Sequence, residues 1–203
     1  MMKLIDITRE LLNAPVYGND PAPRIQPLSR ISLGDADNTS AISACLHNGT
    51  HMDAPKHFIP DGTPIHQVKL ETCIGECVVL ECNGLLLGDE AEKLLPYCKK
   101  RVLFKGDVQL SPSAAFVLSN AGIILLGVEK PSVAPHEYSA EVHRQLLGTG
   151  MVLLEGLDLT HAKVGETYLL MAAPIKIGGV DGSPVRAVLA EPKRIDWSED
   201  LWT

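Results

Sequence analysis

The sequence predicts a mixed α/β fold, α+β in organisation, in a single domain of residues 1–203. Short apolar runs typical of buried strands alternate with segments that carry helix signals, a pattern that indicates strands and helices packed in layers. A chain of 203 residues with 45% hydrophobic residues is also long enough to bury a sizeable core without staples. We find no internal repeat and no low-complexity segment.

Strands are expected wherever a short apolar or alternating run is bounded by turn residues. The segment 41–47, Ala-Ile-Ser-Ala-Cys-Leu-His, alternates in this way and continues directly into a histidine-rich motif. We therefore expect that motif to lie at a strand end and in the loop that follows. The predicted strands are residues 3–8, 41–47, 76–81, 101–104, 122–127, 151–155, 168–174 and 185–190.

Helices are expected between these strands. Ser111 followed by Pro112 is typical of a helix start, because serine caps the free backbone N–H groups and proline suits the first helical position. Gly148 ends another helix. The predicted helices are residues 89–95, 111–119 and 138–147, and a proline-rich loop at 13–23 either presents a side chain to a site or simply connects two elements.

The overall charge excludes some partners. With 18 basic and 25 acidic residues the net charge is −7, which argues against nucleic acid and against an anionic membrane surface. No apolar run is long enough to span a bilayer, and the first residues do not resemble a signal peptide. The five cysteines show no CxxC spacing, so we expect reduced thiols and a cytoplasmic location.

The densest chemical signal is His47-Asn-Gly-Thr-His51-Met-Asp53-Ala-Pro-Lys-His57, with three histidines and one aspartate in a single short segment. Neutral imidazole and carboxylate together suit zinc, manganese or iron. On an extended chain, residues two or four apart point to the same face, so the side chains of His47, His51 and Asp53 can lie on one face and bind the same ion. The proline at 55 fixes the backbone that presents His57.

A catalytic metal site needs more ligands than this segment offers, so partners are expected downstream. Glu155 follows four apolar residues, where a carboxylate is costly to bury unless it is paired or binds a metal. His143 lies on the third predicted helix, and Asp158 and His161 follow the strand end. Composition and spacing leave the choice among these four residues open.

The pattern His47-x-Gly-Thr-His51-x-Asp53-x-Pro55-x-His57 resembles that of the cyclase-like metal-dependent hydrolases, a family that includes the arylformamidases (kynurenine formamidases). The segments 126–132, 143–147, 154–159 and 181–189 resemble later parts of the same family. The resemblance implies the compact single-domain swivelling β/β/α fold of that family. It also implies a homodimer or homotetramer.

The resemblance further implies a two-metal site, with two Zn²⁺ ions per subunit or Mn²⁺ in their place. The first ion would be held by His47, His51 and Asp53. Asp53 would bridge to the second ion, which His143 would bind, and Glu155 would touch both. His57 would be the proton donor and acceptor. Tyr17, in the loop Pro-Val-Tyr-Gly-Asn-Asp, would contact the substrate.

The implied activity is hydrolysis of a small amide of the formamide type, such as N-formyl-L-kynurenine to kynurenine and formate. A divalent ion lowers the pKa of bound water from 15.7 to about 7, so attack by metal-bound hydroxide becomes available at neutral pH. Two alternatives stay open. The first is a family hydrolase of a different cyclic amide or ester, and the second is a non-catalytic module that binds a metal or a small molecule. An open metal position would distinguish catalysis from a closed structural site.

Overall fold

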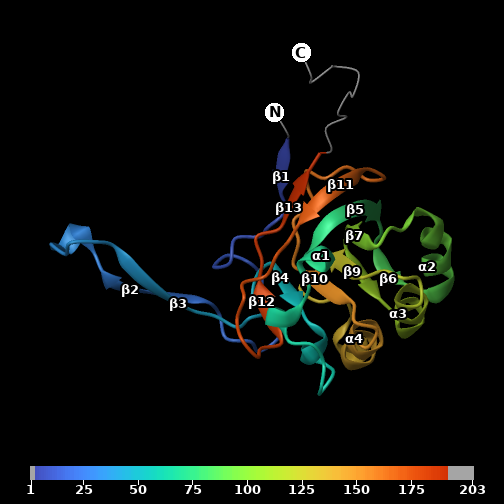
Figure 1. The fold of residues 1–203 in the computed structure, drawn as a ribbon, viewed down its shortest axis with the longest axis horizontal. Helices are drawn as coiled ribbons and strands as arrows, with labels where there is room; N and C mark the ends of the chain where they lie inside the picture. Colours follow the sequence, from blue (N-terminus) through green and yellow to red (C-terminus); the bar gives the residue numbers. More distant parts are fainter. Residues whose placement is uncertain (1–2, 192–203) are drawn as a thin grey trace, which may run out of the picture.

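A nine-stranded mixed sheet organises residues 3–191, the part of the chain that the computed structural model describes (Figure 1). Its four central strands run parallel, and the strands on both flanks are antiparallel. In spatial order the strands are β1 (Leu4–Asp6), β13 (Val188–Ala190), β11 (Thr167–Met171), β5 (Ile74–Glu81), β7 (Arg101–Lys105), β9 (Leu125–Val128), β10 (Val152–Glu155), β4 (His51–Asp53) and β12 (Gly182–Pro184).

Parallel neighbours need crossover connections, and helices provide them here. α2 (Gly88–Leu94), α3 (Pro112–Ser119) and α4 (Ser139–Leu147) all lie on the same side of the sheet (Figure 1). The Ser111 side chain caps α3 by accepting a hydrogen bond of 3.1 Å from the backbone N–H of Ala114. Shorter elements complete the described chain, namely α1 (Leu70–Cys73), the parallel pair β6 (Gly84–Leu86) and β8 (Val108–Leu110), and 3₁₀ turns at Ile31–Leu33, Pro55–His57, Ile65–Gln67, Leu95–Tyr97 and His136–Tyr138.

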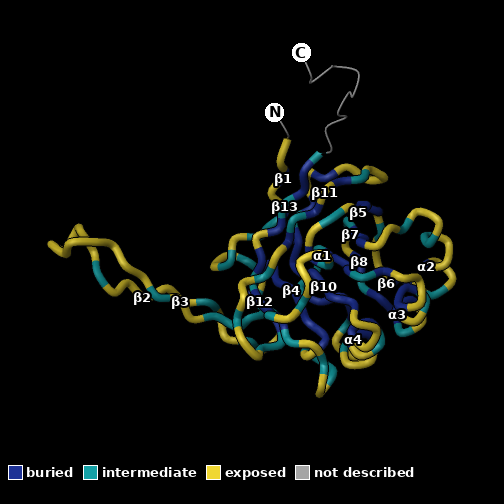
Figure 2. The backbone as a smooth tube through the Cα atoms, in the orientation of Figure 1, coloured by how far each residue is buried: buried dark blue, intermediate teal, exposed yellow. Residues whose placement is uncertain are grey.

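The sheet separates two hydrophobic cores, because successive strand residues point to opposite faces. In β7, Val102 and Phe104 join the core beneath the helices, whereas Leu103 joins the other core. Figure 2 shows the buried backbone concentrated in the central strands. In β4 and β10, the same alternation sends Met52 and Leu154 to the core away from the helices. The polar residues next to them, His51 and Asp53 in β4 and Glu155 in β10, therefore face the helix side.

A two-stranded arm projects from this body. β2 (Arg24–Ser29) pairs with β3 (Thr39–Ser43) in an antiparallel ribbon that extends far from the main sheet (Figures 1 and 2). Neither strand contains a buried residue. Several large apolar side chains on it are exposed, namely Ile25, Leu28, Ile31, Leu33 and Ile42.

The mixed α/β prediction is confirmed, and most predicted elements lie within a few residues of their observed bounds. The strand predicted at 41–47 is wrong in its second half. Asn48 ends β3 early, because its side-chain oxygen accepts from the backbone N–H of Cys45 while its own N–H donates to the Cys45 carbonyl. His51–Asp53 is a strand in its own right, not part of a loop.

Three other predictions can be compared with the structure: the remaining strands, the membrane-spanning segments and the state of the cysteines. The strand predicted at 185–190 is shorter, and β12 and the arm strand β2 were not predicted at all. Among the described residues, no helix is both long enough and apolar enough to cross a membrane. All five cysteines are free thiols.

Candidate metal centre

The pairing of β4 with β10 brings three of the predicted ligands together. His51 lies directly opposite Glu155, and Asp53 lies two residues along the same strand. Residues opposite each other on antiparallel strands, and residues two apart on one strand, share a face. The three side chains therefore converge, and all are buried, with exposures of 1% for His51 and Asp53 and 3% for Glu155.

The helix α4 supplies the fourth side chain. Its residues Val142, His143, Leu146 and Leu147 are buried, which is the i, i+1, i+4 stripe of a helix packed on a sheet. His143 is the polar member of this stripe. Its Nε2 lies 3.4 Å from Oε1 of Glu155 and 3.8 Å from Oδ2 of Asp53.

The remaining two histidines come from the turns on either side of β4. His47 Nδ1 is 2.8 Å from Oδ1 of Asp53, and His57 Nε2 is 4.0 Å from Oδ2 of the same carboxylate. The two imidazole rings stack with their centres 4.1 Å apart. Gly182 makes room for this arrangement, because a Cβ at that position would lie 2.6 Å from His47 Cε1.

Backbone carbonyls fix the orientation of two of these rings. His51 Nδ1 lies 3.0 Å from the carbonyl oxygen of Gly49, and His143 Nδ1 lies 2.6 Å from that of Ser139. A carbonyl only accepts hydrogen bonds, so Nδ1 must carry the proton in both rings. The Nε2 atoms, which face the carboxylates, are then the nitrogens free to bind a metal.

The carboxylates each face two sets of donors. Asp53 presents Oδ1 to His47 and His51, and Oδ2 to His57 and His143. Glu155 presents Oε2 to His51 at 3.3 Å and Oε1 to His143 at 3.4 Å. Each carboxylate therefore lies between two clusters of nitrogen donors.

This arrangement fits divalent metal. Oδ2 of Asp53 is buried and has no hydrogen-bond partner among the described residues, a costly state for a carboxylate oxygen unless a cation satisfies it. Two groups of side chains could each hold an ion, because the ligand atoms within each group lie within 4.8 Å of one another. The groups are His47–Asp53–His57 and His51–Asp53–Glu155. Nitrogen and carboxylate donors in this mixture suit zinc or manganese.

The carboxylates of the site raise the pKa values of three of its histidines. Burial alone would lower the pKa of His47, but its hydrogen bond and charge interaction with Asp53, followed by those with Asp181, outweigh burial and raise it to about 9. Burial likewise opposes the raised pKa values of His51 and His143, which the neighbouring carboxylates produce.

The carboxylates and the last histidine shift in the other direction. Burial would raise the pKa of Asp53 and Glu155, but hydrogen bonds and charges from the surrounding histidines outweigh it and lower both values. Burial is the main cause that lowers the pKa of His57, and repulsion from His47 adds to it. The carboxylates thus favour protonated imidazoles and the imidazoles favour ionised carboxylates, and a divalent cation would supply the same positive charge.

A pocket of about 240 Å³ opens onto this cluster, and Tyr17 lines it together with Phe58 and Pro131. The Tyr17 hydroxyl is buried and has no hydrogen-bond partner among the described residues. Phe58 stacks on His143 with ring centres 4.5 Å apart and packs edge-on against His57. Tyr17, His57 and all the predicted ligands except Asp53 therefore line one pocket, and their individual roles stay predictions.

Sequence reasoning missed Asp181, which contacts both His47 and His57. No local pattern marks it, because it is 134 residues from His47. Of the two further downstream candidates, Asp158 accepts a hydrogen bond from the backbone of Thr160, and neither it nor His161 is in a candidate ligand group of the described residues.

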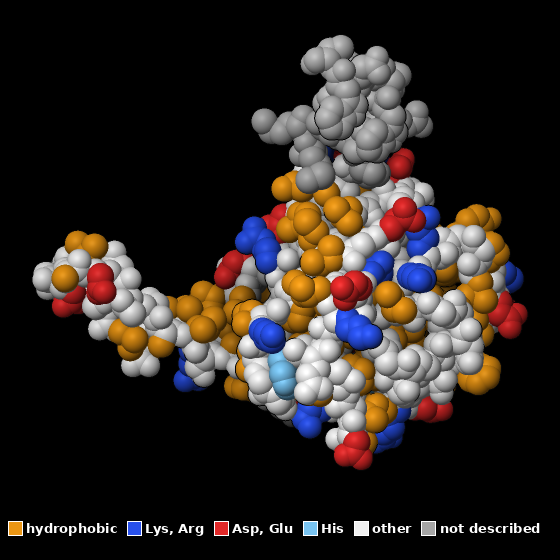
Figure 3. Space-filling model, viewed as in Figure 1, with side chains coloured by type: hydrophobic (Ala, Val, Ile, Leu, Met, Phe, Trp, Pro, Cys, Tyr) orange, Lys and Arg blue, Asp and Glu red, His pale blue; other side chains and the backbone are white. Residues whose placement is uncertain are grey.

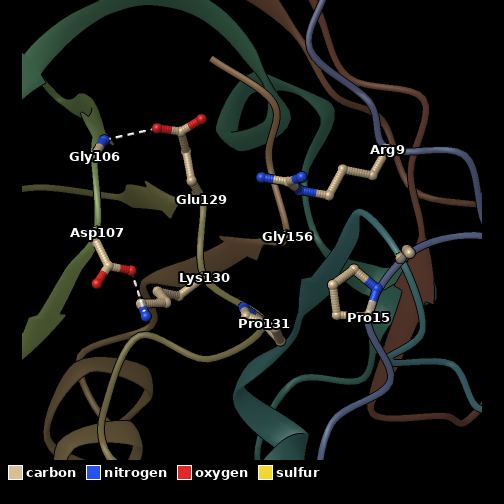
Figure 4. A pocket seen from close by; sticks show the side chains of 10 residues that line it. Arg9, Pro15, Gly106, Asp107, Glu129, Lys130, Pro131 and Gly156 are labelled. Carbon is tan, nitrogen blue, oxygen red and sulfur yellow. Dashed lines mark hydrogen bonds and ion pairs between the residues drawn. The ribbon is translucent and has the colours of Figure 1, made fainter. Parts of the chain in front are cut away.

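A neighbouring cavity of about 410 Å³ shares Pro131 with the site pocket (Figure 4). Both of its acidic side chains are already engaged, and Asp107 forms an ion pair with Lys130. Glu129 accepts hydrogen bonds from the backbone N–H groups of Gly106 at 2.6 Å and Leu159 at 2.9 Å. Glu129 therefore ties two loops together beside the metal centre and is not one of its ligands.

The chain is similar to proteins described as metal-dependent hydrolases. The Cyclase family model, described as "Putative cyclase", matches residues 5–100. A potential metal-dependent hydrolase with cyclase activity is 26% identical over 95% of this chain and 100% of its own, with a TM-score of 0.81. A predicted metal-dependent hydrolase from Bacillus stearothermophilus is 25% identical with the same coverage and TM-score.

An isatin hydrolase bound to the product analogue thioisatinate shares the fold at 21% identity, with a TM-score of 0.83 over 95% of this chain and 93% of that one. The family match, the two hydrolase structures and a buried donor set suited to divalent metal agree with one another. Residues 5–100 thus match the cyclase family, and over nearly its whole length the chain is similar to proteins described as metal-dependent hydrolases.

Proposed function

We propose that this chain hydrolyses a small amide at a centre that holds two divalent ions, Zn²⁺ or Mn²⁺. One observation carries the proposal: Asp53 and Glu155 each present both oxygens to histidine nitrogens of two different clusters. A single structural ion would be enclosed by four protein ligands and would leave no reason for a second donor set. A pocket open to the cluster is what a reacting molecule requires.

The residues of the chain divide the remaining work. His47, His51 and Asp53 would hold one ion, and His143 with the two carboxylates would hold the other. Bound metal supplies a water molecule of lowered pKa and polarises the scissile carbonyl. His57, whose Nε2 lies 4.0 Å from Asp53 Oδ2, would give a proton to the departing nitrogen.

Two side chains shape the place where the substrate binds. The unpartnered hydroxyl of Tyr17 would donate a hydrogen bond to a substrate oxygen, since a buried donor without a partner is costly in the free protein. Phe58 stacks on the face of His143 and packs edge-on against His57, and it would shield His143 from bulk water.

The substrate class that fits best is a compact aryl amide. The site pocket of about 240 Å³ is below the ~300–1,000 Å³ typical of pockets for drug-sized ligands. The shared fold of the isatin hydrolases favours a cyclic amide, which opens to an amine and a carboxylate on one molecule. N-formyl-L-kynurenine offers the same bond between an aryl nitrogen and a carbonyl carbon, and it is the second candidate.

A substrate panel with defined metal content tests this proposal. Metal-free protein is reloaded with Zn²⁺ or Mn²⁺ and offered isatin, other cyclic amides, formanilide and N-formyl-L-kynurenine. We expect turnover of at least one aryl amide, and none after chelation or in the Asp53→Asn variant. Protein that binds metal and leaves the whole panel unchanged would instead be a non-catalytic binding module.

We also propose that the arm of β2 and β3 is covered by a second copy of this chain, giving a homodimer or a homotetramer. A two-stranded ribbon without a core is at best marginally stable in water. This one nevertheless carries a row of apolar side chains, visible along the arm in Figure 3, among which Leu33 is 75% and Leu28 is 60% exposed. A copy related by two-fold symmetry would offer an identical apolar arm in return.

Light scattering coupled to size-exclusion chromatography tests the assembly. The wild-type protein should elute at a multiple of its 21.9 kDa chain mass, and a double variant Leu28→Ser, Leu33→Ser at the single-chain mass. Phe116→Ser is the matched control, because Phe116 is 62% exposed but lies on α3, away from the arm. A monomeric wild type, or an unchanged mass of the double variant, would refute this assembly.

A further inference from the structure

Asp181 is placed beside the metal cluster by the sheet, not by the motif. It immediately precedes β12, in which Gly182 pairs with Asp53 of β4. Its backbone carbonyl accepts a hydrogen bond of 2.9 Å from the N–H of Ala54, which ties it to the end of β4. The position of the Asp181 carboxylate is therefore set by the same strand pairing that positions the predicted ligand Asp53.

One oxygen of Asp181 contacts two imidazoles. Oδ2 lies 2.9 Å from Nε2 of His47 and 3.0 Å from Nδ1 of His57. Both distances are those of good hydrogen bonds. The side chain of Asp181 is 40% exposed, so water still reaches the carboxylate and it is not a member of the buried donor set.

The chemistry of a carboxylate dictates what these contacts do. An ionised carboxylate only accepts, so Nε2 of His47 and Nδ1 of His57 must both carry their protons. Nδ1 of His47 also faces a carboxylate, Asp53 at 2.8 Å, so a metal ion there would take the place of the Nδ1 proton while Nε2–H stays on Asp181. The nitrogen of His57 without a proton is Nε2, which faces the metal cluster. Without this acceptor, either ring can take the opposite tautomer or rotate.

We propose that Asp181 is a positioning residue that holds His47 in its metal-binding tautomer and His57 in its proton-transferring tautomer. Carboxylates that orient metal-bound histidines in this way are a common feature of metal sites. Here one carboxylate serves both a ligand and the proton carrier, and it links metal affinity to proton transfer. The catalytic half of this inference rests on the proposed amide hydrolysis, whereas the metal-binding half does not.

The variant Asp181→Asn tests both halves. The amide has nearly the same shape but loses the charge, and its nitrogen cannot accept a hydrogen bond. We expect Zn²⁺ affinity to fall by about 10- to 100-fold in competition with a chromophoric chelator, at unchanged stoichiometry. Nitrogen-15 NMR of the imidazoles should show the Nδ1–H tautomer of His57 in the wild type and a mixture in the variant. Asp158→Asn is the control, since Asp158 is also a partly exposed carboxylate with a short-range backbone partner.

Turnover provides the third readout. We expect kcat of Asp181→Asn to fall by roughly 100-fold with little change in KM, because proton transfer and not substrate binding is affected. In a His57→Gln background the same substitution should lower kcat much less, since the proton carrier that it positions is gone. Asp181→Glu, which keeps an accepting carboxylate, should recover part of the loss.

Three outcomes would overturn the inference. These are wild-type Zn²⁺ affinity and an unchanged His57 tautomer in Asp181→Asn, the loss of one whole ion from the bound stoichiometry, or effects on kcat that add fully to those of His57→Gln. The chelator and NMR measurements need no substrate. An enzyme without turnover on any amide would therefore refute the proposed function and still leave the positioning role measurable.

Discussion

Alanine at position 182 would disturb the metal centre through a single predictable clash. A Cβ added to Gly182 would lie 2.6 Å from Cε1 and 3.1 Å from Nε2 of His47, and 3.1 Å from the carbonyl oxygen of Met52. Carbon atoms in contact stay about 3.5–4.0 Å apart, so the ring must move by about 1 Å. Metal–ligand distances tolerate only about 0.2 Å, and a displacement of that size removes His47 from the donor set.

We therefore expect Gly182→Ala to lose at least about 10-fold in Zn²⁺ affinity and about 100-fold in turnover, while far-UV circular dichroism shows a folded protein. Chelator competition measures the affinity. The matched control is Gly178→Ala, because a Cβ at 178 meets no heavy atom within 4 Å. If Gly182→Ala binds Zn²⁺ as tightly as the wild type, His47 does not depend on this close approach and the assigned ligand geometry is wrong.

Three further predictions concern the ligands, the fold and the thiols. Asp53→Ala and Glu155→Ala should each abolish bound metal and turnover more completely than the loss of one histidine, because each carboxylate serves both donor clusters; elemental analysis that finds full metal content would contradict this. Ser111→Ala removes the cap of α3 and should lower the free energy of unfolding, measured by urea titration, by about 1 kcal/mol. An unchanged free energy of unfolding would show that the cap does not stabilise the fold. Burial raises the pKa of the Cys73 and Cys98 thiols to about 11, which leaves little thiolate at pH 8. Alkylation of the folded protein should therefore be slow at that pH and accelerate about tenfold per pH unit towards 11, and rapid labelling at pH 8 would show that these thiols are accessible.

The residues that sequence reasoning placed in the site are those with a local signal. His47 to His57 form a dense pattern on a short segment, and the alternation of a strand brings His51 and Asp53 to one face. Glu155 was a candidate because a carboxylate at the end of an apolar run needs a partner. The resemblance to the family, and not the spacing, selected Glu155 and His143 from the four open possibilities.

What the sequence could not predict depends on long-range pairing. Asp181 has no chemical motif around it and reaches the cluster only because β12 pairs with β4. The arm strand β2 was missed for a different reason. It faces no core on either side, so it lacks the contrast between buried and exposed positions on which strand prediction relies.

The place of β4 between β10 and β12 has a consequence for biosynthesis. The histidine motif leaves the ribosome well before the strands that flank it exist. Asp181 follows His47 by 134 residues, which at ~5–20 residues per second corresponds to roughly 7–27 s of translation. For most of that time the nascent chain carries the histidines of the motif without their carboxylate partner Glu155, which is made shortly before Asp181. The donor geometry that discriminates between metals therefore arises only after β10 and β12 have been made and have paired with β4.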